Sequence, residues 1–202
     1  MKRFLKNLFQ KLEDIKNKKY IIGCYESVNV YFEDESRYGL LTQQKRVLTA
    51  KGIKPVGPYQ HKFENTYLFG SFSPINGDSF ILDMPHCDSD CFQSYLNEFS
   101  LEKPKEFKIM ILDNGAFHHA KRLAIPANIA LIFLPPYSPE LNPAEKMWAF
   151  FKRKTSMTIF ENLDALHNYL ADIITKEVNF DLVKSICGNQ SYKTTFKNCF
   201  NV

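Results

Sequence analysis

The sequence predicts an α/β domain, with helices before, between and after the strands of one sheet, and three observations favour this class. An Asn-Gly pair separates two β-rich runs at 66–74 and 78–84, which is a strong hairpin signal. The run 107–112 is apolar with little alternation, as in a strand that is buried on both faces. The stretch 129–154 then passes from an apolar strand through a proline-rich loop into a helix.

The composition allows one domain, or one domain with an appendage. The chain has 202 residues, of which 45% are hydrophobic, enough for a sizeable core. Because no run of eighteen apolar residues occurs, we expect no transmembrane helix. The five scattered cysteines indicate reduced thiols in a cytosolic protein. His86, Cys87 and Cys91 lack a second pair at zinc spacing, so we expect no metal site there.

The N-terminal segment is predicted to be a basic amphipathic helix. Apolar residues in 2–17 recur at helical spacing, with lysines between them. Residues 1–19 carry seven Lys or Arg against two acidic residues, although the whole chain has a net charge of only +4. A basic arm of this kind commonly contacts nucleic acid, but a solvated helix face has the same composition.

The first strand is predicted at 27–34, where apolar and polar residues alternate. Asp34 falls in phase with the apolar residues of this strand. A carboxylate on an apolar face is costly unless it is paired or binds a metal, although Asp34 could also lie just beyond the buried part. A second, short strand is expected at 38–49, which includes Lys45 and Arg46.

The middle of the chain supplies a helix and the central strand. Residues 88–100 have helical spacing, with Asp88 as the N-cap. The apolar run 107–112 ends in Asp113. The Asn-Gly pair that follows gives Asp113 a plain role in a turn, yet functional sites lie at the carboxyl ends of central strands in α/β sheets. A short helix is predicted at 117–123.

The stretch after strand 129–134 fixes the start of the next helix. Four prolines exclude helix and central strand through Pro139. Asn142 then suits an N-cap, with a proline at the first position of a helix at 143–154. Glu145 lies one turn into this helix. In the plain alternative, Glu145 completes a capping box and has no further role.

Three acidic residues, Asp34, Asp113 and Glu145, therefore lie on elements that one sheet would bring together. Three convergent carboxylates suit two divalent cations, since Mg²⁺ prefers oxygen ligands. Two such ions clamp an in-line displacement at phosphorus, where one activates the nucleophile and the other stabilises the leaving oxygen. The sequence therefore predicts metal-dependent phosphoryl transfer.

Three blocks of sequence resemble the catalytic blocks of the IS630 branch of the IS630/Tc1/mariner transposases. They are FEDES at 32–36, DNGAFH at 113–118 and LPPYSPELNPAEKMW at 134–148. The resemblance covers about residues 20–155, and the third block is highly specific. It implies an RNase H-like fold, a mixed β-sheet flanked by helices.

The same resemblance implies a DDE catalytic triad formed by Asp34, Asp113 and Glu145, which would hold two Mg²⁺ or Mn²⁺ ions. Such transposases cut double-stranded DNA at transposon ends and join the 3′-hydroxyls to target DNA, typically at TA dinucleotides. The resemblance also implies a homodimer when active, and a cytoplasmic, nucleoid-associated location. Two alternatives stay open: an inactive DNA-binding or assembly protein of the same fold, and another RNase H-like nuclease such as a junction resolvase.

Further residues of these blocks are expected near the site. His118 matches the histidine of the second block, and we expect it to hold a DNA phosphate or one of the carboxylates. The alternative is a surface histidine at the start of a helix. We expect four other side chains to support the carboxylates or to contact DNA: Asn114, Asn142, Lys152 and Arg153.

The chain departs from the family in two ways. The family carries an N-terminal helix-turn-helix region that recognises transposon ends, so this region is expected from another reading frame. The 31 residues between Asp113 and Glu145 are fewer than expected for this branch. The predicted organisation is a basic helix or linker at 1–19, an RNase H-like catalytic domain at 20–158 and a helical extension at 159–202.

Overall fold

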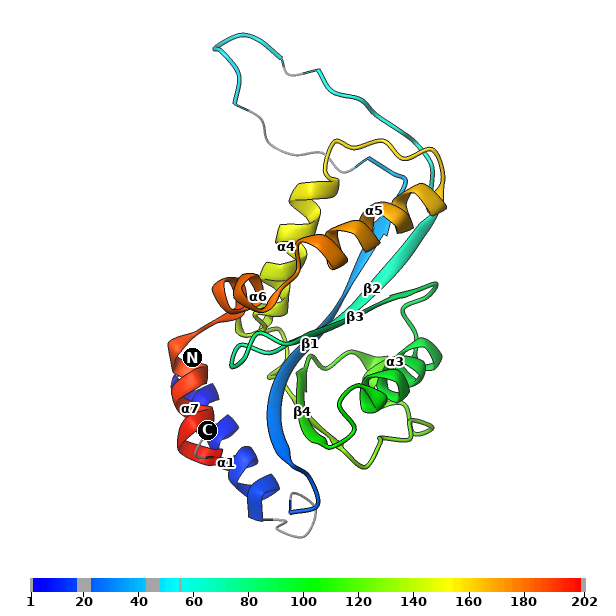
Figure 1. Ribbon diagram of the computed structural model, residues 1–202. Helices are drawn as coiled ribbons and strands as arrows, with labels where there is room; N and C mark the ends of the chain where they lie inside the picture. The colour runs from blue at the N-terminus through cyan, green and yellow to red at the C-terminus, as the bar shows by residue number, and fades with distance from the viewer. Residues whose placement is uncertain (1, 18–22, 43–47, 55, 201–202) are drawn as a thin grey trace.

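A five-stranded mixed sheet forms the centre of the protein in a computed structural model that describes residues 2–17, 23–42, 48–54 and 56–200 (Figure 1). The strand order is β3-β2-β1-β4-β5. β1 pairs antiparallel with β2 and parallel with β4, so the sheet is mixed, as predicted. The strands are β1 (Ser27–Gly39), β2 (Asn65–Phe72), β3 (Ser79–Met84), β4 (Glu106–Leu112) and β5 (Ile129–Phe133).

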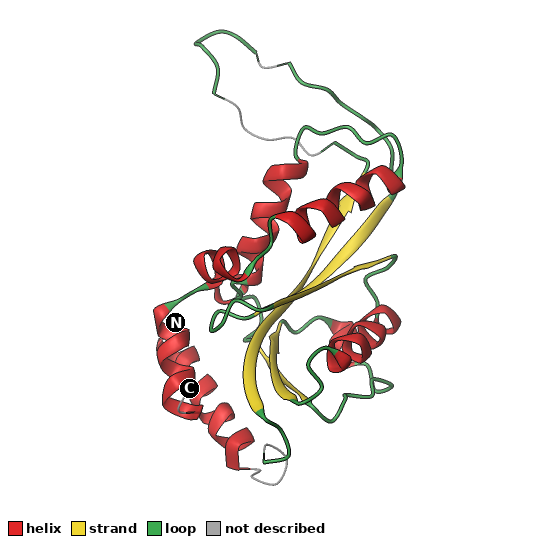
Figure 2. Ribbon diagram, in the orientation of Figure 1, coloured by secondary structure: helices red, strands yellow, loops and turns green. Residues whose placement is uncertain are grey.

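Helices cover both faces of this sheet (Figure 2). They are α1 (Lys2–Asn17), α3 (Ser89–Leu101), α4 (Ala144–Thr155), α5 (Leu163–Lys176), α6 (Phe180–Cys187) and α7 (Gln190–Phe200), with 3₁₀ turns η1 (Ala116–His119) and η2 (Pro139–Leu141). α3 packs on one face, while α1 and α7 pack on the other, where α4, α5 and α6 continue over the β1–β2 part. None of the helices in the described residues has both the length and the apolar character needed to cross a membrane.

The predicted hairpin is confirmed: β2 and β3 pair antiparallel, and a short turn joins them. Gly77 has φ +86°, which glycine adopts without strain. A Cβ at Gly77 would also lie 2.2 Å from the carbonyl oxygen of Phe180. The Asn76 side chain accepts a hydrogen bond from the backbone N–H of Asp78 at 3.0 Å. Local turn chemistry therefore sets this register.

Alternation along β1 sends successive side chains to different cores. Val30 and Phe32 are buried under α1 and α7. Tyr31 is buried on the other face, with the aromatic residues of α3. Burying a side chain such as Phe32 completely stabilises the fold by about 1.5–3 kcal/mol. The same alternation decides which way the acidic residues that follow Phe32 point.

The two ends of the chain pack side by side on the sheet (Figure 1). The ring of Phe4 in α1 meets the ring of Tyr192 in α7 edge-on, with the ring centroids 6.4 Å apart. Tyr192 also contacts Phe32 and donates a hydrogen bond to the Leu141 carbonyl at 2.8 Å. The proposed division at residues 19 and 158 stays a prediction, and α1 and α7 share one hydrophobic core with the sheet.

Two expectations about secondary structure are wrong. No second strand begins at residue 38, because β1 continues to Gly39, which pairs with Asn65 of β2. Residues 40–42 and 48–49 are not strand, and Lys45 and Arg46 lie outside the described residues. The helix expected at 117–123 is only the 3₁₀ turn η1, which has no side-chain cap, and so short a turn does not propagate without one.

Candidate active site

The carboxyl ends of two neighbouring parallel strands bring the first two predicted carboxylates together. β1 and β4 are paired up to Phe32 and Ile111. Asp34 lies two residues after Phe32, and Asp113 lies two residues after Ile111. An aspartate therefore lies just past the part where these two strands pair, at the same edge of the sheet. Parallel pairing alone therefore places these residues beside each other, which a sequence pattern could suggest but not fix.

The start of α4 is tied to β1 by Asn142, which is 4% exposed. The Asn142 side chain donates to the Glu33 carbonyl at 2.8 Å and accepts from the Ala144 N–H at 3.1 Å. The predicted cap is displaced by one residue: α4 begins at Ala144 with Pro143 in the capping position, while Asn142 still accepts from the first helical N–H. These two bonds hold the first turn of α4, and with it Glu145, against the end of β1.

The capping-box explanation for Glu145 fails. A capping box needs the backbone N–H of the capping residue as the donor to the Glu side chain. The N–H of Asn142 is already bonded to the Pro139 carbonyl at 2.8 Å, because η2 precedes the helix. The exposed carboxylate of Glu145 is thus free of this structural task.

Asp34, Asp113 and Glu145 line one pocket of about 380 Å³. The proline-rich loop forms another wall, and Asn114 and Asn142 complete the lining. Asn114 also donates to the Leu134 carbonyl, which ties the end of β4 to the loop after β5. Lys152 and Arg153 lie instead in the exposed last turn of α4 and do not line this pocket.

The pocket is electrostatically unfavourable for the ionised carboxylate of Asp34. Burial raises the pKa of Asp34 well above its usual range, and the negative charge of Glu145 raises it further, followed by the charges of Glu35 and Asp113. This mutual repulsion indicates that the carboxylates lie near one another. It is the kind of charge arrangement that a divalent cation relieves, and oxygen ligands are those that Mg²⁺ and Mn²⁺ prefer.

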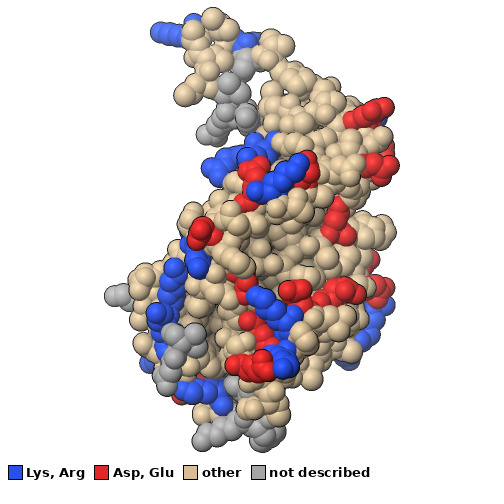
Figure 3. Space-filling model, in the orientation of Figure 1, with Lys and Arg blue, Asp and Glu red and all other residues tan. Residues whose placement is uncertain are grey.

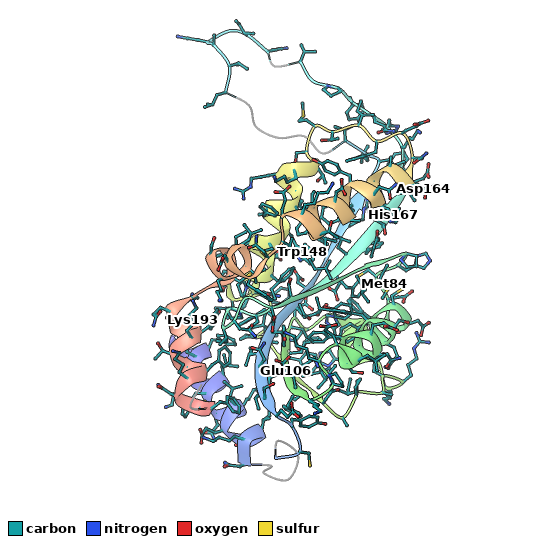
Figure 4. All side chains as sticks on the ribbon, viewed as in Figure 1. Met84, Glu106, Trp148, Asp164, His167 and Lys193 are labelled. Atoms are coloured by element: carbon teal, nitrogen blue, oxygen red, sulfur yellow. The ribbon has the colours of Figure 1, made fainter. Side chains whose placement is uncertain are left out.

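Trp148 of α4 holds Asp34, a contact that the sequence did not predict. The indole Nε1–H donates to Asp34 Oδ2 at 3.0 Å, and Trp148 lies between α4 and the sheet (Figure 4). Gly70 of β2 pairs with Asp34 across the strands. A Cβ at Gly70 would lie 2.6 Å from Trp148 Cη2, so the glycine makes room for the indole ring. The one sequence signal for this contact is the position of Trp148 three residues after Glu145, within the block NPAEKMW.

Asp113 is held on one side of its carboxylate. The Gly115 N–H donates to Asp113 Oδ1 at 2.7 Å, and His118 Nδ1 lies 3.1 Å from the same oxygen. The close approach of the His118 ring lowers the pKa of Asp113, and burial partly opposes this effect. The side chain of Asp113 is still 59% exposed, so it reaches the pocket in its ionised form.

His118 is buried rather than on the surface, so the surface-histidine alternative is wrong. The residue is 3% exposed, and its Nε2 lies 2.9 Å from Glu35 Oε1. Burial lowers the pKa of His118, but Asp113 and Glu35 outweigh this effect and raise it to about 9. His118 Nδ1 lies 3.1 Å from Asp113 Oδ1 but makes no hydrogen bond of regular geometry in the described residues. His119 is exposed and stacks on Phe133.

Glu33 and Glu35 form a second acidic group beside His118. They alternate with Asp34 along β1 and point to the α3 face, and no sequence pattern indicated a role for them. Burial raises the pKa of Glu33 well above its usual range, and the charge of Glu35 adds to this effect. Cys87 lies within reach of the same charges, and burial, then Glu35 and Asp34, raise its pKa to about 11.

Comparison with known proteins gives a family and a fold. The family model described as DDE superfamily endonuclease matches residues 29–167. The chain is 38% identical over 100 residues to the uncharacterized protein y4pE/y4sA of Sinorhizobium fredii (strain NBRC 101917 / NGR234), a match that covers 48% of this chain and 74% of that protein.

Two solved structures illustrate the fold. A pre-cleavage Mos1 transpososome has a TM-score of 0.64 at 13% identity, over 98% of this chain and 61% of the Mos1 chain. The Mos1 mariner paired end complex with Mn has a TM-score of 0.61 at 15% identity, over 98% and 61% of the two chains. The predicted RNase H-like fold is confirmed, and this chain spans about three fifths of the length of these Mos1 chains.

Proposed function

Because this chain belongs to the DDE superfamily of endonucleases and carries its catalytic domain, we propose that it is the catalytic domain of a transposase. It cuts double-stranded DNA at transposon ends and transfers the resulting 3′-hydroxyls into target DNA. One observation carries this proposal: Asp34, Asp113 and Glu145, from β1, β4 and α4, line a single pocket. The similar solved structures include a Mos1 strand transfer complex and a Mos1 mariner paired end complex, which supports the same chemistry.

The three carboxylates would hold two Mg²⁺ or Mn²⁺ ions, and Mos1 paired end complexes of similar fold are known with Mn and with Mg. Bound ions would activate the attacking oxygen and stabilise the leaving oxygen of the cut phosphodiester. The chain's own part is to keep the carboxylates in place before DNA arrives. Trp148 orients Asp34, His118 and the Gly115 amide orient Asp113, and Asn142 fixes the turn that carries Glu145.

DNA would approach along a hollow that continues from the pocket. A second hollow of about 350 Å³ shares Asn114, Leu134 and Pro135 with the pocket and reaches Lys11 of α1. Tyr137 stands fully exposed at the rim, where an aromatic ring would stack on a base. Lys and Arg side chains lie along α7, while basic and acidic side chains are mixed over the rest of the face in view (Figure 3).

The active assembly would contain more than this domain. Exposed Lys152 and Arg153 would contact DNA phosphates, which position a protein without specifying sequence. Recognition of the transposon ends would come from a helix-turn-helix region in addition to this domain. The active form would be a homodimer that holds two ends.

Glu145→Gln tests the proposal most sharply. Glutamine keeps the length of the side chain but offers one neutral oxygen, so it is a poor ligand for a divalent cation. We expect cleavage of DNA that carries the terminal repeats to fall at least about 100-fold in Mg²⁺, a loss of roughly 2.7 kcal/mol of transition-state stabilisation. The thermal midpoint should not change, because Glu145 is exposed and does not serve in a capping box.

A matched control is Glu140→Gln, an exposed glutamate of η2 that does not line the pocket. This variant should cut like the parent. The assay uses the chain with a helix-turn-helix region fused or supplied in trans. Cleavage by Glu145→Gln at the parent's rate would refute the triad, and a parent that cuts branched DNA but not transposon ends would indicate a junction resolvase.

A further inference from the structure

A second group of possible metal ligands lies on the face of the sheet opposite the pocket. Glu33, Glu35 and His118 each offer one ligand atom, and these atoms lie within 4.8 Å of one another. Alternation along β1 explains the separation, because Asp34 points toward α4 while its two neighbours point toward α3. The group is therefore distinct from the pocket that Asp34 and Glu145 line.

The interior of this group contains a carboxylate that makes no hydrogen bond in the described residues, although His118 Nε2 lies 3.8 Å from it. Glu33 is 0% exposed, and within the described part of the chain neither of its side-chain oxygens has a hydrogen-bond partner. The side chains of His118 and Glu35 are 1% and 10% exposed. The rings of Phe92 and Phe117 cover His118 at centroid distances of 4.5 and 4.1 Å. A buried carboxylate without a hydrogen bond is costly, and a cation bound between Glu33, Glu35 and His118 would remove this cost.

The spacing of the ligand atoms suits a small tetrahedral ion. Zinc lies about 2.0–2.2 Å from nitrogen and oxygen ligands, so neighbouring ligands of a tetrahedral site are about 3.3 Å apart. His118 Nε2 lies 2.9 Å from Glu35 Oε1 and 3.8 Å from Glu33 Oε2. These two separations bracket the tetrahedral value, and only small rotations of the side chains are needed to admit the ion.

The other ring nitrogen of His118 has the environment of a metal ligand. A histidine that binds a metal through one nitrogen usually presents the other to a carboxylate or carbonyl oxygen, which fixes the ring. His118 Nδ1 lies 3.1 Å from Asp113 Oδ1. The imidazole ring thus spans from the buried acidic pair to a carboxylate of the pocket.

We propose that Glu33, Glu35 and His118 Nε2 bind one divalent cation of the zinc class. Imidazole suits zinc, whereas Mg²⁺ keeps several waters and prefers an all-oxygen shell, which this covered site does not provide. The ion holds His118 with Nδ1 toward Asp113, so a structural ion on one face of the sheet positions a carboxylate on the other. The binding site stands without the proposed function, while its effect on Asp113 rests on that function.

The test counts zinc on the full chain. The protein is stripped with a chelator, reloaded with Zn²⁺ in excess Mg²⁺, separated from free metal by gel filtration and analysed by atomic emission. We expect one zinc per chain in the parent and in the double variant Asp34→Asn/Glu145→Gln, and none in Glu33→Gln or Glu35→Gln. The matched control is Glu106→Gln, a carboxylate that is 7% exposed and bonded to Tyr31 instead; this variant should keep its zinc.

A spectroscopic probe on the parent makes the test independent of how the variants fold. Co²⁺ in this site should give the visible absorption of tetrahedral coordination without a thiolate charge-transfer band, which would exclude Cys87 and Cys91 as ligands. Zn²⁺ should also raise the thermal midpoint of the parent, since an ion that binds only the folded state stabilises it.

The proposal is overturned if the parent retains no zinc, if folded Glu33→Gln retains as much as the parent, or if Co²⁺ gives no tetrahedral absorption. Failure of the proposed function looks different. In that case the parent does not cut transposon ends in Mg²⁺, whether or not it holds zinc. If zinc positions Asp113, the stripped parent in Mg²⁺ should cut more slowly, and reloading should restore the rate.

Discussion

Three successive acidic residues of β1 have three different environments. Glu33 is closed off under α3, Asp34 accepts a hydrogen bond from Trp148, and Glu35 lies at the edge of the buried cluster beside His118. In water these side chains would behave almost alike. Their different surroundings raise the pKa of Glu33 and of Asp34 well above the usual range, chiefly through burial.

Removing the Trp148 donor should affect activity more than folding. Trp148→Phe keeps an aromatic ring in the core but leaves Asp34 Oδ2 without its donor. A hydrogen bond to a charged group contributes about 1.5–3 kcal/mol, so we expect cleavage to fall about 10- to 100-fold. The measurement is the rate at saturating Mg²⁺, beside the thermal midpoint.

The control for this variant is Phe151→Leu, which trims another fully buried aromatic residue of the same core. It should lose a comparable amount of stability and keep its cleavage rate. Equal losses of rate in the two variants would mean that Trp148 acts only through packing.

Cys87 should react slowly with alkylating reagents despite its exposure. Burial, Glu35 and Asp34 raise its pKa to about 11, and only the thiolate reacts. At pH 8 such a thiol is about 0.1% ionised, and the rate should rise with pH up to about 11. Mass spectrometry of iodoacetamide-treated protein measures this rate, with guanidinium-unfolded protein as the control. A native rate equal to the unfolded rate at pH 8 would contradict the assigned environment.

At the scale of elements, the sequence predicted the features that depend only on residues close together in the chain, such as turns, helix caps and apolar runs. The β2–β3 turn, the Asp88 cap of α3 and the buried strand β4 all follow from residues within each element. β1 was predicted too short because its last residues are strand only through pairing with β2. The burial of His118 and the bond from Trp148 to Asp34 depend on α3, α4 and β1 packing together, which no local pattern encodes.

The start of α4 should be sensitive to Asn142 for both stability and activity. Asn142→Ala removes the bond to the Glu33 carbonyl as well as the cap on Ala144, so we expect a loss of about 1–3 kcal/mol of unfolding free energy. Cleavage should fall as well, because Glu145 loses its fixed position. Urea denaturation and the cleavage assay measure the two effects.

Asn162→Ala is the matched comparison, since Asn162 caps α5 through the Ala165 N–H, away from the pocket. It should cost about 1 kcal/mol of stability, typical of a lost cap, and leave cleavage intact. If both variants cut at the parent's rate, Asn142 serves only as a cap.

At the scale of the whole molecule, both ends of the chain complete one face of the sheet. α1 and α7 lie together over β1 and β4, and α1 forms a wall of the hollow that adjoins the pocket. α4, α5 and α6 form a second hydrophobic cluster with the far part of β1 and β2. The basic amphipathic helix predicted at 2–17 is confirmed as α1, and its apolar side packs as part of the core beside the site.

DNA binding by this chain alone should be weak and steeply dependent on salt. Its exposed cations neutralise phosphates, and each contact contributes about 0.9 to the slope of log K against log salt. Lys152→Ala/Arg153→Ala should reduce that slope by about 2 for every DNA sequence alike. Lys176→Ala is the control, because Lys176 is paired with Asp172 at 2.8 Å on α5. Tight, sequence-specific binding that survives high salt would contradict this prediction.

Because side chains alternate along β1, a shift of its register by one residue would move every following side chain to the other face of the sheet. Side chains repeat every second residue along a strand, so deleting one residue between Phe32 and Asp34 would turn the downstream side chains to the opposite face. Glu35 would then take the position toward α4 that Asp34 occupies, with a longer side chain and a different distance to Trp148. A shift of one residue along β1 would thus exchange the side chains that face the pocket with those that face the buried cluster under α3. The pairing of Asp34 with Gly70, where only glycine leaves room for the indole ring, opposes such a slip.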